Sequence, residues 1–167
     1  TDSAQVAELP DLVREGAAAE AKERNLEGWV VTLQYPSMSP FMMYSSNREL
    51  KEKLWKAYNT RAFGGEFDNS KIVEEIADTR LQVARLLGYD TYADYVLEER
   101  MAESAPTVNA FLTELLDRAI GAAHADVKSV AEYAAANGFT GELMPWDFSY
   151  YSEKLKNEKY SINEELT

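Results

Sequence analysis

The chain has 167 residues, 46% apolar and 28% charged, which is the composition and size of a globular domain with a hydrophobic core and excludes a disordered or fibrous protein. Its net charge of −12 is spread along the chain and disfavours nucleic acid and anionic membranes as partners, and no apolar run approaches the roughly 20 residues of a membrane span. There is no cysteine, so neither a disulfide nor a thiolate metal site can form.

The N-terminal part of the chain predicts two helices separated by one strand. Residues 10–24 are rich in Ala and Glu and carry small residues on one face, which predicts a helix. Residues 29–35, from Trp29 to Tyr35, are β-branched and aromatic and stop at Pro36, which predicts a short β-strand. Ser39 and Pro40 then provide a capping hydroxyl and a first-turn proline, so a short helix is expected to begin there.

The remainder of the chain is predicted to be helical. Apolar residues at three- and four-residue spacing indicate four helices, which run from Asn47 to Gly64, from Asp68 or Asn69 to Gly88, from Thr91 to Arg100 and from Ser104 to Asn137. The apolar positions of the longest helix are Val108, Phe111, Leu112, Leu115, Ala119, Ala123, Val127, Val130 and Ala134. Asp147 is expected to cap a final helix that includes Leu155. The predicted fold class is mainly α: one bundle-like, multi-helix domain over residues 1–167, with one or two short strands near Trp29–Tyr35.

The last residues of the chain resemble the beginning of another helix. Ser161-Ile162-Asn163-Glu164 matches a capping box, in which Ser and Glu side chains satisfy each other's backbone N–H groups. Only three residues follow Glu164, and a helix of one or two turns is marginal because nucleation is costly. We therefore expect this chain to be a fragment of a larger protein.

His124 is the single histidine of the chain and the first candidate for a metal ligand. A helical zinc site of the H-E-x-x-H type needs two histidines four residues apart, so that both imidazoles point at one metal. The residues three and four positions from His124 are Ile120, Gly121, Val127 and Lys128, none of which is an acidic or imidazole ligand. His124 is therefore interpreted as an ordinary helix residue.

Carboxylates are abundant but lie on the polar sides of the predicted helices. The two densest groups are Glu74, Glu75 and Asp78, and Glu98, Glu99 and Glu103. Solvated surface charge explains such groups better than a catalytic acid–base pair does. Nucleophile elbows and phosphate-binding glycine loops are also absent from the sequence. We predict no catalytic, cofactor-binding or metal-binding residue in this chain.

Two further features could bind a peptide. The aromatic cluster of Trp146, Phe148, Tyr150 and Tyr151 could line a cleft, although core packing is the favoured interpretation. The predicted strand around Trp29 could pair with an extended peptide, although a small structural sheet is favoured there.

A series of short motifs in a fixed order extends over nearly the whole chain. The motifs are Gly28-Trp29-Val30 with Thr32-Leu33, Pro40-Phe41-Met42, Asn47-Arg48-Glu49-Leu50, Leu54, Tyr58, Thr60-Arg61-Ala62, Asp68-Asn69, Leu86-Leu87-Gly88-Tyr89, Tyr92-Ala93-Asp94-Tyr95, Met101-Ala102, Pro145-Trp146-Asp147 and Tyr150-Tyr151. Their order and spacing resemble the zinc oligopeptidase family that includes thimet oligopeptidase, oligopeptidase A and the bacterial peptidyl-dipeptidases. The Tyr35-Pro36 pair and the acidic helices look most similar to the peptidyl-dipeptidase branch.

This resemblance implies a large helical enzyme with a deep channel and one zinc ion, held by the histidines of H-E-x-x-H and a downstream glutamate. Such enzymes hydrolyse short peptides. In the family the zinc motif lies beyond a segment like this one, so no zinc ligand or catalytic residue is transferred to any position here. The resemblance thus implies a non-catalytic helical segment of a zinc metallopeptidase, either an oligopeptidase or a peptidyl-dipeptidase, that supports or walls the substrate channel and is inactive alone.

The expected partners follow from the same resemblance. They are peptide substrates of the parent enzyme and the remaining portion of the same polypeptide, with no nucleic acid and no membrane, and any oligomer of this chain is expected to be an artefact of truncation. Zinc is expected in the parent enzyme and not in this chain. The expected location is cytoplasmic, or periplasmic if a leader has been removed. The alternative interpretation is a self-contained helical protein-binding or scaffold domain that exposes Trp146 and Tyr150 to a partner.

Overall fold

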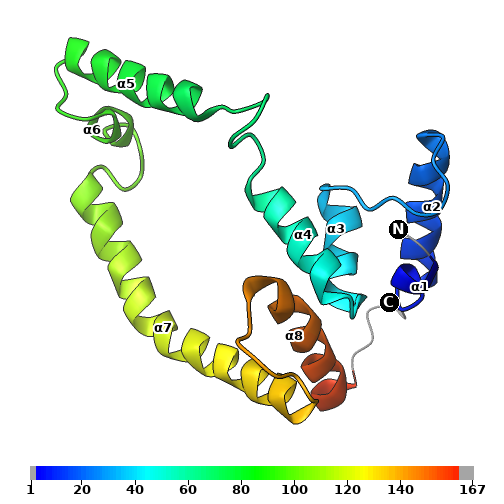
Figure 1. Ribbon diagram of the computed structural model, residues 1–167. Helices are drawn as coiled ribbons and strands as arrows, with labels where there is room; N and C mark the ends of the chain where they lie inside the picture. The colour runs from blue at the N-terminus through cyan, green and yellow to red at the C-terminus, as the bar shows by residue number, and fades with distance from the viewer. Residues whose placement is uncertain (1–2, 162–167) are drawn as a thin grey trace. The chain divides into compact units, whose positions relative to one another are not determined.

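The computed structural model describes residues 3–161, and these residues fold into helices joined by irregular segments (Figure 1). The helices are α1 (Ser3–Val6), α2 (Asp11–Glu23), α3 (Tyr35–Tyr44), α4 (Arg48–Asn59), α5 (Ser70–Leu86), α6 (Tyr92–Leu97), α7 (Ala105–Ala136) and α8 (Pro145–Tyr160). The mainly helical fold class is therefore confirmed. Within the described residues, none of the helices combines the length and the hydropathy that crossing a bilayer requires.

The predicted strand at Trp29–Tyr35 is wrong, because the described part of the chain contains no β-strand. A strand needs a neighbouring strand to bond its backbone, and this segment finds other partners. The Val30 N–H donates to the Ala17 carbonyl of α2 (3.0 Å), and the Thr32 N–H donates to Ser37 Oγ (2.9 Å). The apolar side chains of this irregular segment still serve the core, since Trp29 packs against it.

Helix α3 begins earlier than predicted, at Tyr35 instead of near Ser39. Gln34 has an extended backbone (ψ 140°) and precedes the helix, and Pro36 lies in the first turn, where its missing N–H breaks no hydrogen bond. Pro40, expected at the first position, lies inside the helix instead. Pro36, interpreted from the sequence as the end of a strand, therefore marks the beginning of a helix instead.

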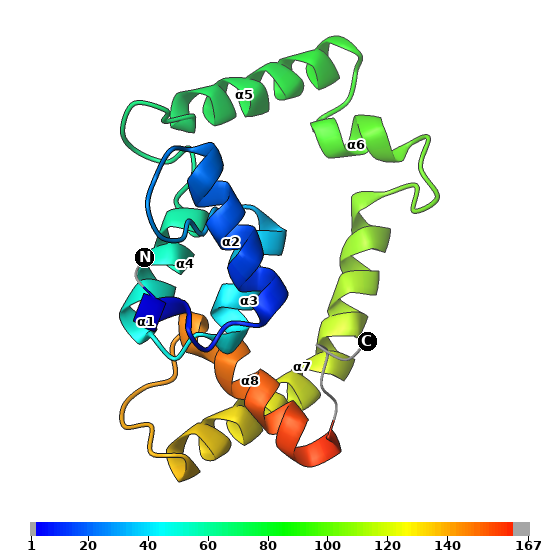
Figure 2. The same cartoon turned by 90° about the vertical axis from the view of Figure 1, so that its right-hand side faces the viewer.

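The chain divides into two compact units, residues 1–59 with 127–167 and residues 60–126. In the first unit, Figures 1 and 2 both show α3 and α4 beside α8, and these helices are in contact. The core of this unit is built on Val6, Leu9 and Phe41, and the partly buried side chains packed against it are Val13, Trp29, Val31, Tyr44, Leu50 and Leu54. Fully burying a side chain of this size contributes roughly 1.5–3 kcal/mol.

The second unit contains α5, α6 and the N-terminal part of α7, and α5 packs on α6. Gly88 ends α5 as predicted: it adopts φ 89°, a left-handed conformation that favours glycine, and the Tyr89 N–H donates back to the Ala84 carbonyl (2.9 Å). Thr91 caps α6, because its hydroxyl accepts from the Asp94 N–H (3.1 Å). Local turn and capping chemistry therefore sets the helix boundaries of this unit.

The final predicted helix is present as α8 and ends at Tyr160. Ser161, the last described residue, follows it with φ 53° as the C-cap. The rest of the predicted capping box lies outside the described residues.

Candidate functional site

A cluster of charged side chains joins α4 to α8 in the first unit; we call Arg48, Lys51, Asp147 and Lys154 the α4–α8 charge cluster. Lys51 and Asp147 are buried, whereas Arg48 and Lys154 are exposed. Asp147 is 1% exposed, and both its oxygens are bonded to the guanidinium of Arg48 (3.0 Å from Nε, 2.9 Å from Nη2). This two-pronged ion pair holds the pKa of Arg48 above its usual value. The pair joins residues 99 positions apart in the sequence.

Asp147 was expected to cap α8 and instead lies in its first turn, two residues after Pro145. There its Oδ2 accepts a hydrogen bond from the Met144 N–H (3.0 Å). A carboxylate at this end of a helix also interacts favourably with the helix dipole. Each carboxylate oxygen of Asp147 therefore has a structural partner.

Lys51 is the second buried member of the cluster, at 2% exposed. Its Nζ lies 4.1 Å from the centre of the Tyr150 ring, and Lys154 Nζ lies 4.4 Å from the centre of the same ring. Burial lowers the pKa of Lys51 to about 8, with Arg48 and Lys154 adding repulsion, while a hydrogen bond with Tyr150 raises the pKa of Lys154. The Tyr150 ring thus stabilises two ammonium groups by cation–π contacts.

The predicted aromatic cluster is part of the same interface. Trp146 and Tyr150 are buried, at 7% and 9% exposed, as core packing predicts. Trp146 packs edge-on against Trp55 of α4 with 5.6 Å between ring centres, and Tyr150 packs edge-on against Tyr151 at 5.1 Å. Phe148 is half-buried. Trp146 and Tyr150 therefore hold α8 against α4.

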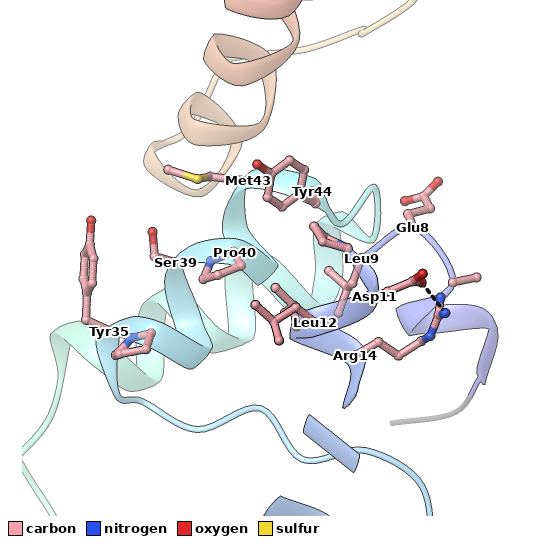
Figure 3. A pocket seen from close by; sticks show the side chains of 14 residues that line it. Glu8, Leu9, Asp11, Leu12, Arg14, Tyr35, Ser39, Pro40, Met43 and Tyr44 are labelled. Carbon is pink, nitrogen blue, oxygen red and sulfur yellow. Dashed lines mark hydrogen bonds and ion pairs between the residues drawn. The ribbon is translucent and has the colours of Figure 1, made fainter. Parts of the chain in front are cut away.

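An open groove of about 990 Å³ lies between the beginning of α2 and α3 (Figure 3). The lining residues are Ala7, Glu8, Leu9, Pro10, Asp11, Leu12, Val13, Arg14, Tyr35, Pro36, Ser39, Pro40, Met43 and Tyr44. Figure 3 shows Leu12 of α2 beside Pro40 of α3, with the Asp11–Arg14 ion pair (2.5 Å) near them. Glu8 accepts from the Ser46 N–H (2.7 Å), and hydrogen bonding by the Ser46 side chain, with a smaller effect of that N–H, lowers the pKa of Glu8. All three charged side chains of the groove already have partners, so the groove offers contact surface but no catalytic pair.

The predicted carboxylate groups lie where solvated charge was expected. All six side chains, Glu74, Glu75, Asp78, Glu98, Glu99 and Glu103, are exposed. Asp78 accepts from Gln82 Nε2 (2.6 Å), and Glu98 accepts from the Tyr89 hydroxyl. No desolvation prepares any of them for acid–base catalysis.

The described part of the chain does not bring together a set of side chains that fits a zinc ion. His124 is exposed on α7, and residues 3–161 contain no group of three or more His, Cys, Asp or Glu side chains that could hold a metal. Zinc sites need three or four protein ligands. No reaction step is therefore assigned to a metal within the described residues.

Sequence reasoning missed the two α4 residues of the charge cluster, Arg48 and Lys51. A usable signal was present, because Arg48, Lys51 and Trp55 recur at spacings of three and four and so share one helix face. The groove had no comparable signal, because it depends on how α2 and α3 pack.

Comparison with known proteins identifies relatives of the chain. The family model described as Peptidase family M3 matches residues 41–167. Oligopeptidase A of Escherichia coli (strain K12) is 41% identical over 170 residues, which cover 99% of this chain and 25% of that protein. Oligopeptidase A of Haemophilus influenzae is 38% identical over 169 residues, which cover 98% of this chain and 25% of the relative. Dipeptidyl carboxypeptidase of Escherichia coli (strain K12) is 28% identical over 167 residues, which cover 98% of this chain and 24% of the relative.

Two facts follow from these matches. The chain spans about a quarter of the length of the curated relatives that it matches. Its identity with oligopeptidase A, at 41%, exceeds its identity with dipeptidyl carboxypeptidase, at 28%. The overall identities therefore favour the oligopeptidase A branch, whereas the Tyr35-Pro36 pair suggested the peptidyl-dipeptidase branch.

Proposed function

This chain belongs to peptidase family M3, and from that premise we propose that it is the non-catalytic helical segment of a zinc metallopeptidase that hydrolyses short peptides. The segment supports or walls the substrate channel of that enzyme. Its partners are peptide substrates of the whole enzyme and the remaining portion of the same polypeptide. We retain one helical domain and a cytoplasmic location as parts of this proposal.

The observation that carries the proposal is that the chain belongs to a peptidase family, while its described residues lack a set of metal ligands. Relatives named as peptidases match 98–99% of the chain, yet the described residues hold no group that could bind a metal. We therefore propose that the zinc chemistry of the family lies in a portion of the polypeptide other than this one. What this chain supplies is a framework in which the Arg48–Asp147 pair and the aromatic contacts of Trp146 fix α8 to α4.

The test compares this chain with the full reading frame of its gene. The purified 167-residue chain is expected to bind no stoichiometric zinc and to cleave no peptide. The full-length product is expected to contain zinc and to hydrolyse short peptides in a chelator-sensitive manner. Metal analysis and cleavage of a fluorogenic oligopeptide measure both. Tight zinc binding with chelator-sensitive cleavage by the 167-residue chain would contradict the proposal.

The alternative of a self-contained protein-binding domain needs exposed aromatic anchors. Trp146 and Tyr150, the two side chains expected to meet a partner, are 7% and 9% exposed and face α4. The observed packing therefore supports the peptidase segment over the binding module.

A further inference from the structure

Helix α7 carries a continuous apolar stripe whose two ends have different surroundings. Toward the C-terminal end, Val130 and Ala134 are buried, at 4% and 0% exposed. In the second unit the large side chains of the stripe are open: Phe111 is 61% exposed, Leu112 53%, Leu115 48%, Leu116 58% and Ile120 41%. The described residues of the second unit leave this part of the stripe uncovered.

We propose that the open part of the stripe, formed by Phe111, Leu112, Leu115, Leu116 and Ile120, is the surface on which another apolar segment of the same polypeptide packs. This inference rests on the proposed function, and it deepens it by naming the face of the chain that the rest of the enzyme covers. We call these five residues the α7 face.

The residue pattern of the α7 face supports a packed occupant over solvent. Phe111, Leu115 and Leu112, Leu116, Ile120 form two adjacent rows at four-residue spacing, which is the arrangement of a helix buried along one side. Of the charged side chains of the same region, Glu114 and Asp117 lie on the other side of the helix, and Arg118, at the edge of the α7 face beside Phe111, pairs with Glu114 (2.7 Å). A contiguous exposed apolar patch of this kind marks an interaction site.

The length of the relatives indicates where the segment that packs on the α7 face comes from. The chain covers 25% of Escherichia coli oligopeptidase A, so a protein of that length has about three quarters of its residues elsewhere. The face carries no charge that would select a charged ligand, although the whole chain has a net charge of −12. An apolar segment of the same polypeptide meets this requirement at high effective concentration, because it is covalently tethered.

The α7 face is tested by thiol protection, because the 167-residue chain has no cysteine of its own. In the full-length product, labelling is read by mass spectrometry on the peptide that carries the introduced thiol, so that the signal reports one position. The variant is Leu112→Cys, and the matched control is Asp117→Cys, on the opposite side of the same helix and also exposed. Each is made in the 167-residue chain and in the full-length product, and the rate of maleimide labelling is measured at micromolar protein. Both thiols are expected to react fast in the 167-residue chain. In the full-length product, labelling at position 112 is expected to slow at least tenfold, while labelling at position 117 stays fast.

Equal labelling at position 112 in both proteins overturns the inference, and so does a reading frame that ends at Thr167. Concentration-dependent protection of position 112 in the 167-residue chain also overturns it, since the occupant would then be a second copy. Far-ultraviolet circular dichroism verifies that each variant keeps its helices. Zinc content and peptide cleavage judge the proposed function separately, so a full-length enzyme that is active but unprotected at position 112 refutes the surface alone.

Discussion

Lys51 combines near-complete burial with a positive charge. Its ammonium group lies over the Tyr150 ring, with Arg48 and Lys154 adding repulsion and Asp147 and Glu8 adding attraction. No described residue forms an ion pair with it. Burial dominates the balance and lowers the pKa of Lys51 from 10.5 to about 8. The charged form of Lys51 is therefore a cost to the folded first unit at neutral pH.

The first prediction at this scale is a pH dependence of stability. Between pH 8 and 10.5 the unfolded chain binds the Lys51 proton more than the folded chain does, so the free energy of unfolding rises with pH across this window. The rise attributable to Lys51 is at most about 3 kcal/mol. The measurement is urea unfolding at several pH values for the native chain and for Lys51→Met, which removes the titration and keeps the apolar stem. As pH rises, the free energy of unfolding of the native chain is expected to increase relative to that of Lys51→Met. The same pH dependence in both proteins would refute the role given to Lys51.

The Arg48–Asp147 ion pair shows how one contact joins two helices. Asp147→Ala is expected to destabilise the first unit by about 3 kcal/mol, because it leaves the guanidinium and the Met144 N–H without their acceptor. Arg48 is 45% exposed, so water recovers part of the loss. The matched control is Asp11→Ala, which breaks the exposed Asp11–Arg14 pair and is expected to cost at most about 1 kcal/mol. Equal losses of unfolding free energy for Asp147→Ala and Asp11→Ala, measured in denaturant, would show that the Arg48–Asp147 pair stabilises the chain no more than an exposed ion pair does.

Helix boundaries with a local capping signal were predicted well, whereas the start of α3 and the end of α4 were not. Gly88 and Thr91 act through their own backbone or a hydroxyl a few residues away, so their signals are local and the structure confirms them. The strand at Trp29–Tyr35 failed because a strand depends on a partner elsewhere in the chain. Local chemistry fixes where helices end, whereas pairing depends on tertiary packing.

At the scale of the molecule, the candidate site shows the same difference between local signals, which the sequence reveals, and tertiary packing, which it does not. Periodicity placed Leu112 and Val130 on one stripe of α7, but it could not tell that one is exposed and the other buried. The burial of Lys51 was equally hidden, because a lysine on a helix is normally solvated and here α8 covers it. The family was recognisable from the order of short motifs, since that order is read directly from the sequence and does not depend on tertiary contacts.

The exposure of the α7 face leads to a prediction for the 167-residue chain as a whole. It is expected to bind Nile red, a neutral apolar dye, whereas an anionic dye would be repelled by the net charge of −12. Replacing Leu112 and Leu116 together by Glu is expected to reduce the dye fluorescence at least twofold, because both side chains are more than half exposed in the patch. Helical content should stay the same, since Leu and Glu have similar helix propensity and neither side chain is in the core. Asp117→Asn, on the opposite side of α7, serves as the control and should leave the fluorescence unchanged. Undiminished dye binding by the double variant would mean that the exposed apolar surface of the chain lies elsewhere, for example on α5, where Ile72 and Leu86 are also exposed.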